Sequence, residues 1–247
     1  MKSLRYLRMD FALPISFEKI GAFRGAVARK VGIENVLFHH HLPNQPALVG
    51  VLTPAVVGVS TDDTKNRYLY RYPLIQYKRL YGKAAIICLG DAVNEIHKLF
   101  EDTDWEVEMG NSTFPLKIAR LDLKEYNLEV YQGEKQNYTY SIQNWLALNH
   151  ENYEVYQNTS SLKKRIELLE RILSSHLLSF AKGIEWNLEN RFELEIQELQ
   201  PHYTMSYKTT KLTAFSLTFQ TNLFLPNYIG LGKGSSRGFG MIKFLKK

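Results

Sequence analysis

The sequence has one cysteine, Cys88, and no apolar run approaching the roughly 18 residues that a membrane-spanning helix needs. A lone cysteine cannot form an internal disulfide or a thiolate metal cluster, which predicts a reducing compartment. Its place in the apolar run 84–89 favours burial as a small hydrophobic side chain. Residues 1–5 also lack the apolar core of a signal peptide. We therefore expect a cytoplasmic protein with no membrane partner.

Acidic residues are missing from two long stretches of the chain. Lysine and arginine total 31 against 25 aspartates and glutamates, a net charge of +6, and residues 65–83 and 233–247 contain cations but no acid. Tyrosines are interleaved with the cations of the first stretch. This combination is typical of RNA binding, where rings and guanidinium planes stack on unpaired bases. The alternative interpretation is an ordinary solvated basic face.

Hydrophobic periodicity in the first half predicts a split βαβ arrangement. A helix over 17–31 has Ser16 as a candidate N-cap and Gly32 as its stop. The expected strands lie at 4–13, 68–77, 83–89 and 105–109, with a second helix at 91–100.

The second half repeats the plan more loosely. Its clearest element is a helix over 161–182 that ends at Gly183, with expected strands at 117–131, 138–142, 192–198, 203–208, 212–224 and 241–245. The sequence thus predicts an α+β fold of two tandem ferredoxin-like (RRM-like, βαββαβ) domains. We expect them to occupy 1–111 and 112–247, with a glycine-rich loop near the C-terminus.

Residues 230–240 hold five glycines and two cations, Lys233 and Arg237. So many glycines indicate positive φ angles or close backbone approach, and free N–H groups beside cations predict an anion-binding concavity. A flexible hairpin tip is the alternative. The segment is not a nucleotide P-loop, because Gly234 follows Lys233 where serine or threonine is required. No βαβ unit follows it, which excludes a dinucleotide fingerprint.

Three consecutive histidines, His39, His40 and His41, precede a Pro-Asn turn. In an extended chain His39 and His41 share one face and His40 lies on the other. Two imidazoles suit acid–base chemistry on RNA, whose 2′-hydroxyl is a built-in nucleophile. A His-x-His metal site and a structural polar loop remain alternatives.

Three segments carry a family resemblance. The brackets Gly230-Leu-Gly232 and Gly238-Phe-Gly240, the histidine segment 38–42 and the aromatic segment 70–78 resemble the RAMP superfamily of CRISPR-associated proteins. The resemblance is to the branch of endoribonucleases that cut the CRISPR repeat transcript and carry a His-x-His segment. A departure is His40, which makes the residue between the two aligned histidines a third histidine.

This resemblance implies a metal-independent, cofactor-free endoribonuclease that leaves a 2′,3′-cyclic phosphate and a 5′-hydroxyl. It implies catalytic roles for His39 and His41, with His40 left open. The expected RNA-binding residues are Gly230, Gly232, Lys233, Gly234, Ser235, Ser236, Arg237, Gly238 and Gly240, together with Arg24, Arg29, Arg67, Arg71 and Lys78.

The partner implied is CRISPR repeat RNA, as precursor and as mature product. Subunits of a CRISPR interference complex and a second copy of the chain are left open as partners. The rival function is a non-catalytic RNA-binding subunit of such a complex, and a metal-dependent nuclease is a further alternative.

Overall fold

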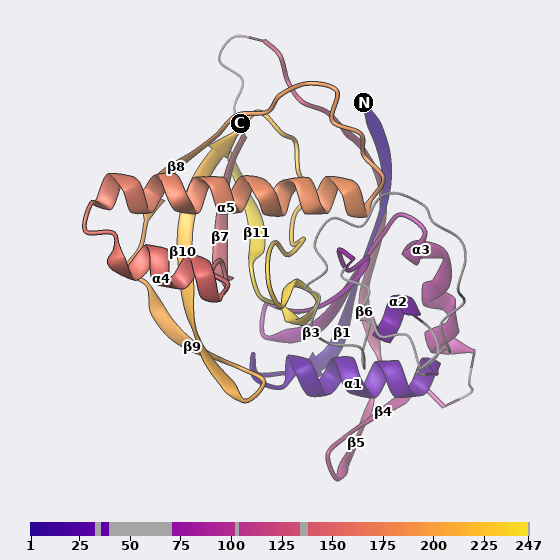
Figure 1. Ribbon diagram of the computed structural model, residues 1–247. Helices are drawn as coiled ribbons and strands as arrows, with labels where there is room; N and C mark the ends of the chain where they lie inside the picture. Colours follow the sequence, from indigo (N-terminus) through magenta and orange to yellow (C-terminus); the bar gives the residue numbers. More distant parts are fainter. Residues whose placement is uncertain (33–35, 40–70, 102–103, 134–137, 247) are drawn as a thin grey trace, which may run out of the picture.

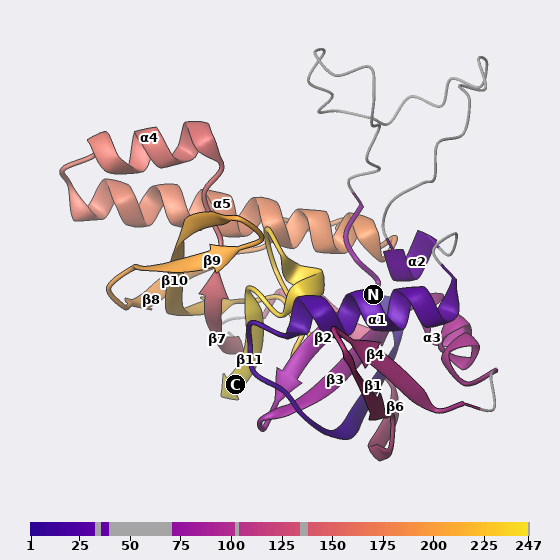
Figure 2. The same ribbon diagram turned by 90° about the horizontal axis from the view of Figure 1, so that it is seen from below.

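The computed structural model describes residues 1–32, 36–39, 71–101, 104–133 and 138–246. Its strands form two antiparallel sheets, one in each half of the chain, and a separate two-stranded hairpin. The long helices α1 and α5 are seen against the sheets in Figures 1 and 2. Among the described residues, no helix is both long and apolar enough to cross a membrane.

The first sheet has the strand order β2-β3-β1-β6. Between β1 and β2 lie α1 and the short α2, and between β3 and β6 lies α3, which continues into the 3-10 helix η1. This is the βαββαβ plan that the sequence predicts. The elements are β1 (Lys2–Pro14), α1 (Ile20–Val31), α2 (Val36–His39), β2 (Ile75–Leu80), β3 (Lys83–Leu89), α3 (Ala92–Glu95), η1 (Ile96–Phe100) and β6 (Ile118–Leu128).

The last strand of the first sheet differs from the prediction. The strand expected near 105–109 exists as β4 (Glu106–Met109), but within the described part of the chain its one strand partner is β5 (Ser112–Pro115), with which it forms a hairpin. The sheet is instead completed by β6, which pairs with β1 as far as Leu128. The division expected after residue 111 therefore falls too early, because the first sheet needs β6 as its edge.

The second sheet has the order β11-β7-β10-β8, the same plan as the first. β9 extends β8 along the same edge of β10. The crossover from β10 to β11, all of which is described, contains only one helical turn, η2. The elements are β7 (Tyr138–Trp145), α4 (His150–Asn158), α5 (Leu162–Gly183), β8 (Leu194–Leu199), β9 (Tyr203–Tyr207), β10 (Thr210–Thr221), η2 (Ser235–Arg237) and β11 (Met241–Lys246).

Local signals explain where the helices begin and end. The Ser161 side chain accepts a hydrogen bond from Lys164 N and caps α5, whose apolar stripe is buried against the second sheet. Gly32, with φ of 99°, ends α1. Ser16 does not cap α1 as expected, because the helix begins later, at Ile20. The strand expected at 68–77 begins only at Ile75 within the described residues, since 71–74 is irregular.

The two domains are joined by a shared apolar core. Alternate side chains of β1 point to opposite faces of the first sheet. Met9 and Phe11 belong to the cluster that includes α1, whereas Leu4 and Tyr6 belong to the cluster that includes α5 and the second sheet. On the face of the first sheet that is turned away from α1, the part around Leu4 and Tyr6 is thus covered by the second domain.

Candidate nucleic-acid interface

The glycine loop, residues 230–240, lies between α5 and α1 in both views of the molecule (Figures 1 and 2). Gly234 and Gly238 have left-handed φ values of 75° and 87° and flank the single helical turn η2. Gly232 and Gly240 also have positive φ. The expectation of positive φ in this segment is therefore confirmed.

The glycine loop is closely packed on its inner side. A Cβ atom on Gly240 would lie 1.9 Å from the carbonyl oxygen of Leu231, and one on Gly230 would lie 2.6 Å from the Nζ of Lys78. Neither position has room for a side chain. This packing does not fit the alternative of a flexible hairpin tip.

Three side chains of the first domain bind the backbone of the glycine loop. The Tyr72 hydroxyl donates to the carbonyl oxygen of Gly230 at 2.9 Å, and the amide of Gly230 donates to Gln76 Oε1 at 2.7 Å. Lys78 Nζ donates to the carbonyl oxygen of Ser235 at 2.9 Å. A short segment that ends in β2 thereby fixes the loop at two points, and we call these three residues the latch.

Lys78 is fully buried, which corrects its predicted role in binding RNA. Its side chain is 0% exposed and ends beneath the loop. Burial lowers the pKa of its ammonium group to about 7. A side chain enclosed in this way does not meet a ligand in solvent; its contact is with Ser235.

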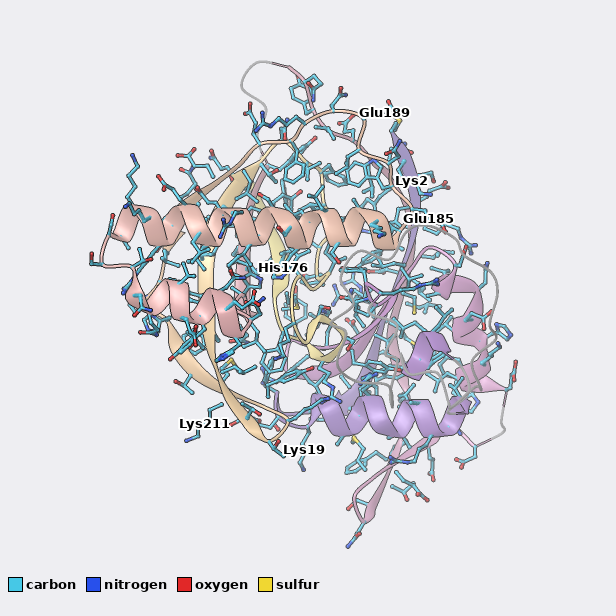
Figure 3. All side chains as sticks on the ribbon, in the orientation of Figure 1. Lys2, Lys19, His176, Glu185, Glu189 and Lys211 are labelled. Carbon is cyan, nitrogen blue, oxygen red and sulfur yellow. The ribbon has the colours of Figure 1, made fainter. Side chains whose placement is uncertain are left out.

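Trp145 and His176 support the glycine loop from the second domain. Trp145 Nε1 on β7 donates to His176 Nδ1 on α5 at 3.1 Å, and a Cβ atom on Gly232 would lie 2.9 Å from each of the two rings. Figure 3 labels His176 on α5. Burial lowers the pKa of His176 to about 4, so the ring is neutral at pH 7. With Nδ1 accepting, its proton is on Nε2.

Neither partner of this pair was among the predicted site residues. His176 continues the apolar stripe of α5, three residues after Leu173 and four before Phe180. The imidazole within this apolar stripe is the sequence signal that could have identified the pair, because a buried imidazole needs a hydrogen-bond partner.

The outer side of the glycine loop carries its cations. Lys233 is exposed and Arg237 is partly exposed, and they lie 5.6 and 5.8 Å from the centre of the Tyr207 ring on β9. Ser236 is also partly exposed, whereas Ser235 is buried. Two cations beside one aromatic ring suit an RNA chain, with a phosphate on the charges and a base near the ring.

The backbone amides of the glycine loop are largely used within the protein. Leu231 N donates to the carbonyl oxygen of Gly240, and Gly240 N donates to that of Asn144. The amides of Ser235, Arg237 and Phe239 donate to carbonyl oxygens inside the loop. The predicted concavity of successive free N–H groups is therefore wrong for these five residues. The exposed side chains of the outer side remain available to an anion.

The remaining predicted RNA-binding residues lie in different surroundings. Arg24 on α1 is buried. Its burial, and to a smaller extent the nearby charge of Arg237, lowers its pKa. Arg29 is exposed near the other end of α1, where its Nη2 donates to the carbonyl oxygen of Glu108. Arg71 is exposed directly before the latch. Arg67 lies outside the described residues.

The histidine segment is described only in part. His39 is the last residue of α2, so the backbone at this position is helical rather than extended as expected. The side chain of His39 and the whole of His40 and His41 lie outside the described residues. The helix α2 contacts α1, which also contacts η2 of the glycine loop. The histidine segment therefore begins next to a helix that borders the loop.

Models of protein families match most of the chain in two parts. Residues 59–127 match the Cas6b N-terminal domain and residues 132–245 match the Cas6b C-terminal domain. The gap between the two matches begins at Leu128, where β6 ends. Both halves of the molecule are thus similar to one family, with the domain division that the sheets indicate.

Solved structures and one curated relative are also similar. A crystal structure of Cas6b covers 99% of this chain and 100% of its own, with a TM-score of 0.81 and 22% identity. A structure described as the CRISPR RNA processing endoribonuclease Cas6b covers the same shares, with a TM-score of 0.68 and 20% identity. An uncharacterized protein of Methanocaldococcus jannaschii, MJ0978, is 35% identical over 101 residues, which are 41% of this chain and 67% of that protein.

Proposed function

Because the chain belongs to the Cas6b family of CRISPR-associated RNA-processing proteins, we propose that it cuts CRISPR precursor RNA within the repeats. The observation that carries the proposal is the outer face of the glycine loop. Lys233 and Arg237 are presented there together, over one aromatic ring, on a backbone that both domains hold in place. The RNA backbone runs over this face, and the same face holds the mature product.

The chemistry that we propose uses the 2′-hydroxyl of the RNA as the nucleophile. One of His39 and His41 takes the proton from this hydroxyl, and O2′ attacks the neighbouring phosphorus atom. The bond from phosphorus to O5′ breaks, and the other histidine gives its proton to O5′. The products are a 2′,3′-cyclic phosphate and a 5′-hydroxyl. Atoms and protons balance without a metal ion.

The contacts around the glycine loop support a common site for both domains. The loop is bordered by α1 and by the latch, and these first-domain elements precede and follow the histidine segment in the chain. Phe17, just before α1, also packs edge-on against Phe239 of the loop. RNA on the outer face therefore lies on a loop that is bordered by first-domain elements from before and after the histidine segment in the sequence.

Incubation of a cognate repeat RNA with the protein in EDTA, analysed on a denaturing gel, tests the proposal. We expect cleavage by the wild type and a loss of about 100-fold or more in rate for His39→Ala and for His41→Ala. His40→Ala tests the third histidine. His150→Ala, on the exposed start of α4, is the matched control and is expected to cut normally.

Each contrary outcome has a distinct meaning. Tight binding of the repeat RNA by the wild type without any cutting identifies an RNA-binding subunit. Cutting that stops in EDTA and returns with a divalent cation identifies a metal-dependent nuclease. Wild-type rates for both His39→Ala and His41→Ala overturn the catalytic assignment.

A further inference from the structure

The latch binds the glycine loop directly beneath the cations that face outward. Ser235, whose carbonyl oxygen accepts from Lys78, lies between Lys233 and Arg237 and begins η2. The second attachment uses both backbone groups of Gly230, where the loop begins. Rotation of the loop about either point alone is therefore blocked by the other.

The side chains of the latch are themselves held in place. Gln76 and Lys78 are two residues apart on β2 and so point to the same face of the first sheet. Gln76 Nε2 donates to the carbonyl oxygen of Pro73 at 3.0 Å, which orients its Oε1 toward Gly230. Tyr72 packs edge-on against Phe180 of α5, with the ring centroids 5.2 Å apart. All three latch side chains are buried.

A buried ammonium group at this point is costly if its only role is to fill space. Among the described residues, the carbonyl oxygen of Ser235 is the one acceptor for Lys78 Nζ. One neutral acceptor compensates little of the desolvation of a charge, whereas a methionine fills a similar volume without that cost. Lys78 supplies a hydrogen-bond donor at the end of a long side chain. This donor binds the carbonyl oxygen of Ser235, which lies between the two outward-facing cations.

We propose that Tyr72, Gln76 and Lys78 are positioning residues, which set the glycine loop against the first domain so that bound RNA presents its scissile linkage there. This proposal rests on the proposed function. The latch touches neither RNA nor the reacting atoms. It acts through the loop, by fixing where Lys233 and Arg237 hold the backbone.

The latch has a matched control within the same domain interface. Tyr6 is also a buried tyrosine of the first domain, and its hydroxyl donates to a second-domain carbonyl oxygen, that of Asn227, at 2.9 Å. This contact lies just before the glycine loop, whereas the Tyr72 hydroxyl binds the loop itself. Tyr6→Phe and Tyr72→Phe therefore remove the same kind of bond between the domains and differ in whether the loop is held.

The experiment compares cleavage with binding in the full chain. Single-turnover cleavage of a repeat RNA is measured for the wild type, Lys78→Met, Tyr72→Phe and Tyr6→Phe, below the melting temperature of each variant. Binding is measured with the same RNA carrying a 2′-deoxy residue at the scissile linkage, which removes the nucleophile. Because misplacement of a bound substrate by about 1 Å can cost about 100-fold in rate, we expect Lys78→Met to cut about 10- to 100-fold more slowly. We expect a smaller loss for Tyr72→Phe.

The expected signature is a lower cleavage rate with a Kd within about threefold of the wild type, because Lys233 and Arg237 remain in every variant. Tyr6→Phe is expected to cut at the wild-type rate. The proposal is overturned if Lys78→Met and Tyr72→Phe both cut as fast as Tyr6→Phe, or if rate and affinity fall together in proportion. A wild type that binds the RNA and never cuts it overturns the proposed function, and this proposal with it.

Discussion

The inner and outer faces of the glycine loop differ in what they expose and in what holds them. The inner face consists of backbone groups that buried first-domain side chains bind and that Trp145 and His176 of the second domain pack against. The outer face presents Lys233 and Arg237 over Tyr207. The eleven residues thus combine a structural face and a binding face. Changes to the inner face should act on stability and positioning, and changes to the outer face should act on RNA affinity.

The largest effect is expected on the inner face at Gly240. Gly240→Ala places a Cβ 1.9 Å from the carbonyl oxygen of Leu231 at a residue with φ of 59°. Strain and overpacking together should lower the free energy of unfolding by about 2–5 kcal/mol, measured by denaturant titration. The control is Gly21→Ala on α1, where a Cβ meets nothing within 4 Å. We expect it to stabilise the protein by up to about 1 kcal/mol. Equal effects of the two changes would refute the close packing of the loop.

The pH dependence of stability tests the burial of Lys78 at the inner face of the glycine loop. Burial lowers its pKa from 10.5 to about 7, so between these values the unfolded chain binds more protons than the folded one. The free energy of unfolding should therefore rise with pH in this window, by at most about 1.4 kcal/mol per pH unit from this group. Denaturant titrations at pH 7 to 10 should show this slope in the wild type relative to Lys78→Met. Identical pH profiles would contradict the burial of a titrating ammonium.

The outer cations should affect affinity and leave stability unchanged. Lys233→Ala and Arg237→Ala should each weaken binding of the 2′-deoxy repeat RNA about tenfold. Each should also reduce the slope of log affinity against log salt by about 0.7. Lys163→Ala, at the exposed start of α5, is the control. Lower unfolding midpoints in the two loop variants, together with an unchanged salt slope, would mean that these cations stabilise the fold and do not bind RNA.

The smallest effect is expected at Tyr207. Its ring faces Lys233 and Arg237, and partly exposed cation–π contacts are worth about 0.5–1 kcal/mol each. Tyr207→Leu should reduce RNA affinity a few-fold, whereas Tyr207→Phe, which keeps the ring, should bind as the wild type does. A fluorescence anisotropy titration separates the two. If the phenylalanine variant is the weaker one, the hydroxyl rather than the ring is responsible.

Elements whose signals are local were predictable from the sequence. The strand 83–89 and the helix beginning after Ser161 match the structure because a continuous apolar run, an apolar stripe and a cap are all encoded within the element. The partner of β6 was not predictable, because its pairing with β1 joins residues more than 100 positions apart. The domain division was misplaced for the same reason.

The interpretation of Lys78 shows why the site was harder to predict than the fold. In the sequence it is one cation in a basic run, which favours a solvated role. In the structure both faces of β2 are covered, one by α1 and the other by the second domain, so Gln76 and Lys78 are as buried as Ile75 and Tyr77. A pattern within one strand does not reveal a second domain on its polar face.

Photo-crosslinking of the 2′-deoxy repeat RNA to the full chain, with mass spectrometry of the crosslinked peptides, tests the central claim most directly. We predict that peptides with residues 39–41 and peptides with residues 233–237 both crosslink to the nucleotides flanking one linkage, the linkage that the wild type cuts in unmodified RNA. Crosslinks of the two peptides to nucleotides far apart, or of the loop peptide to none, would contradict it.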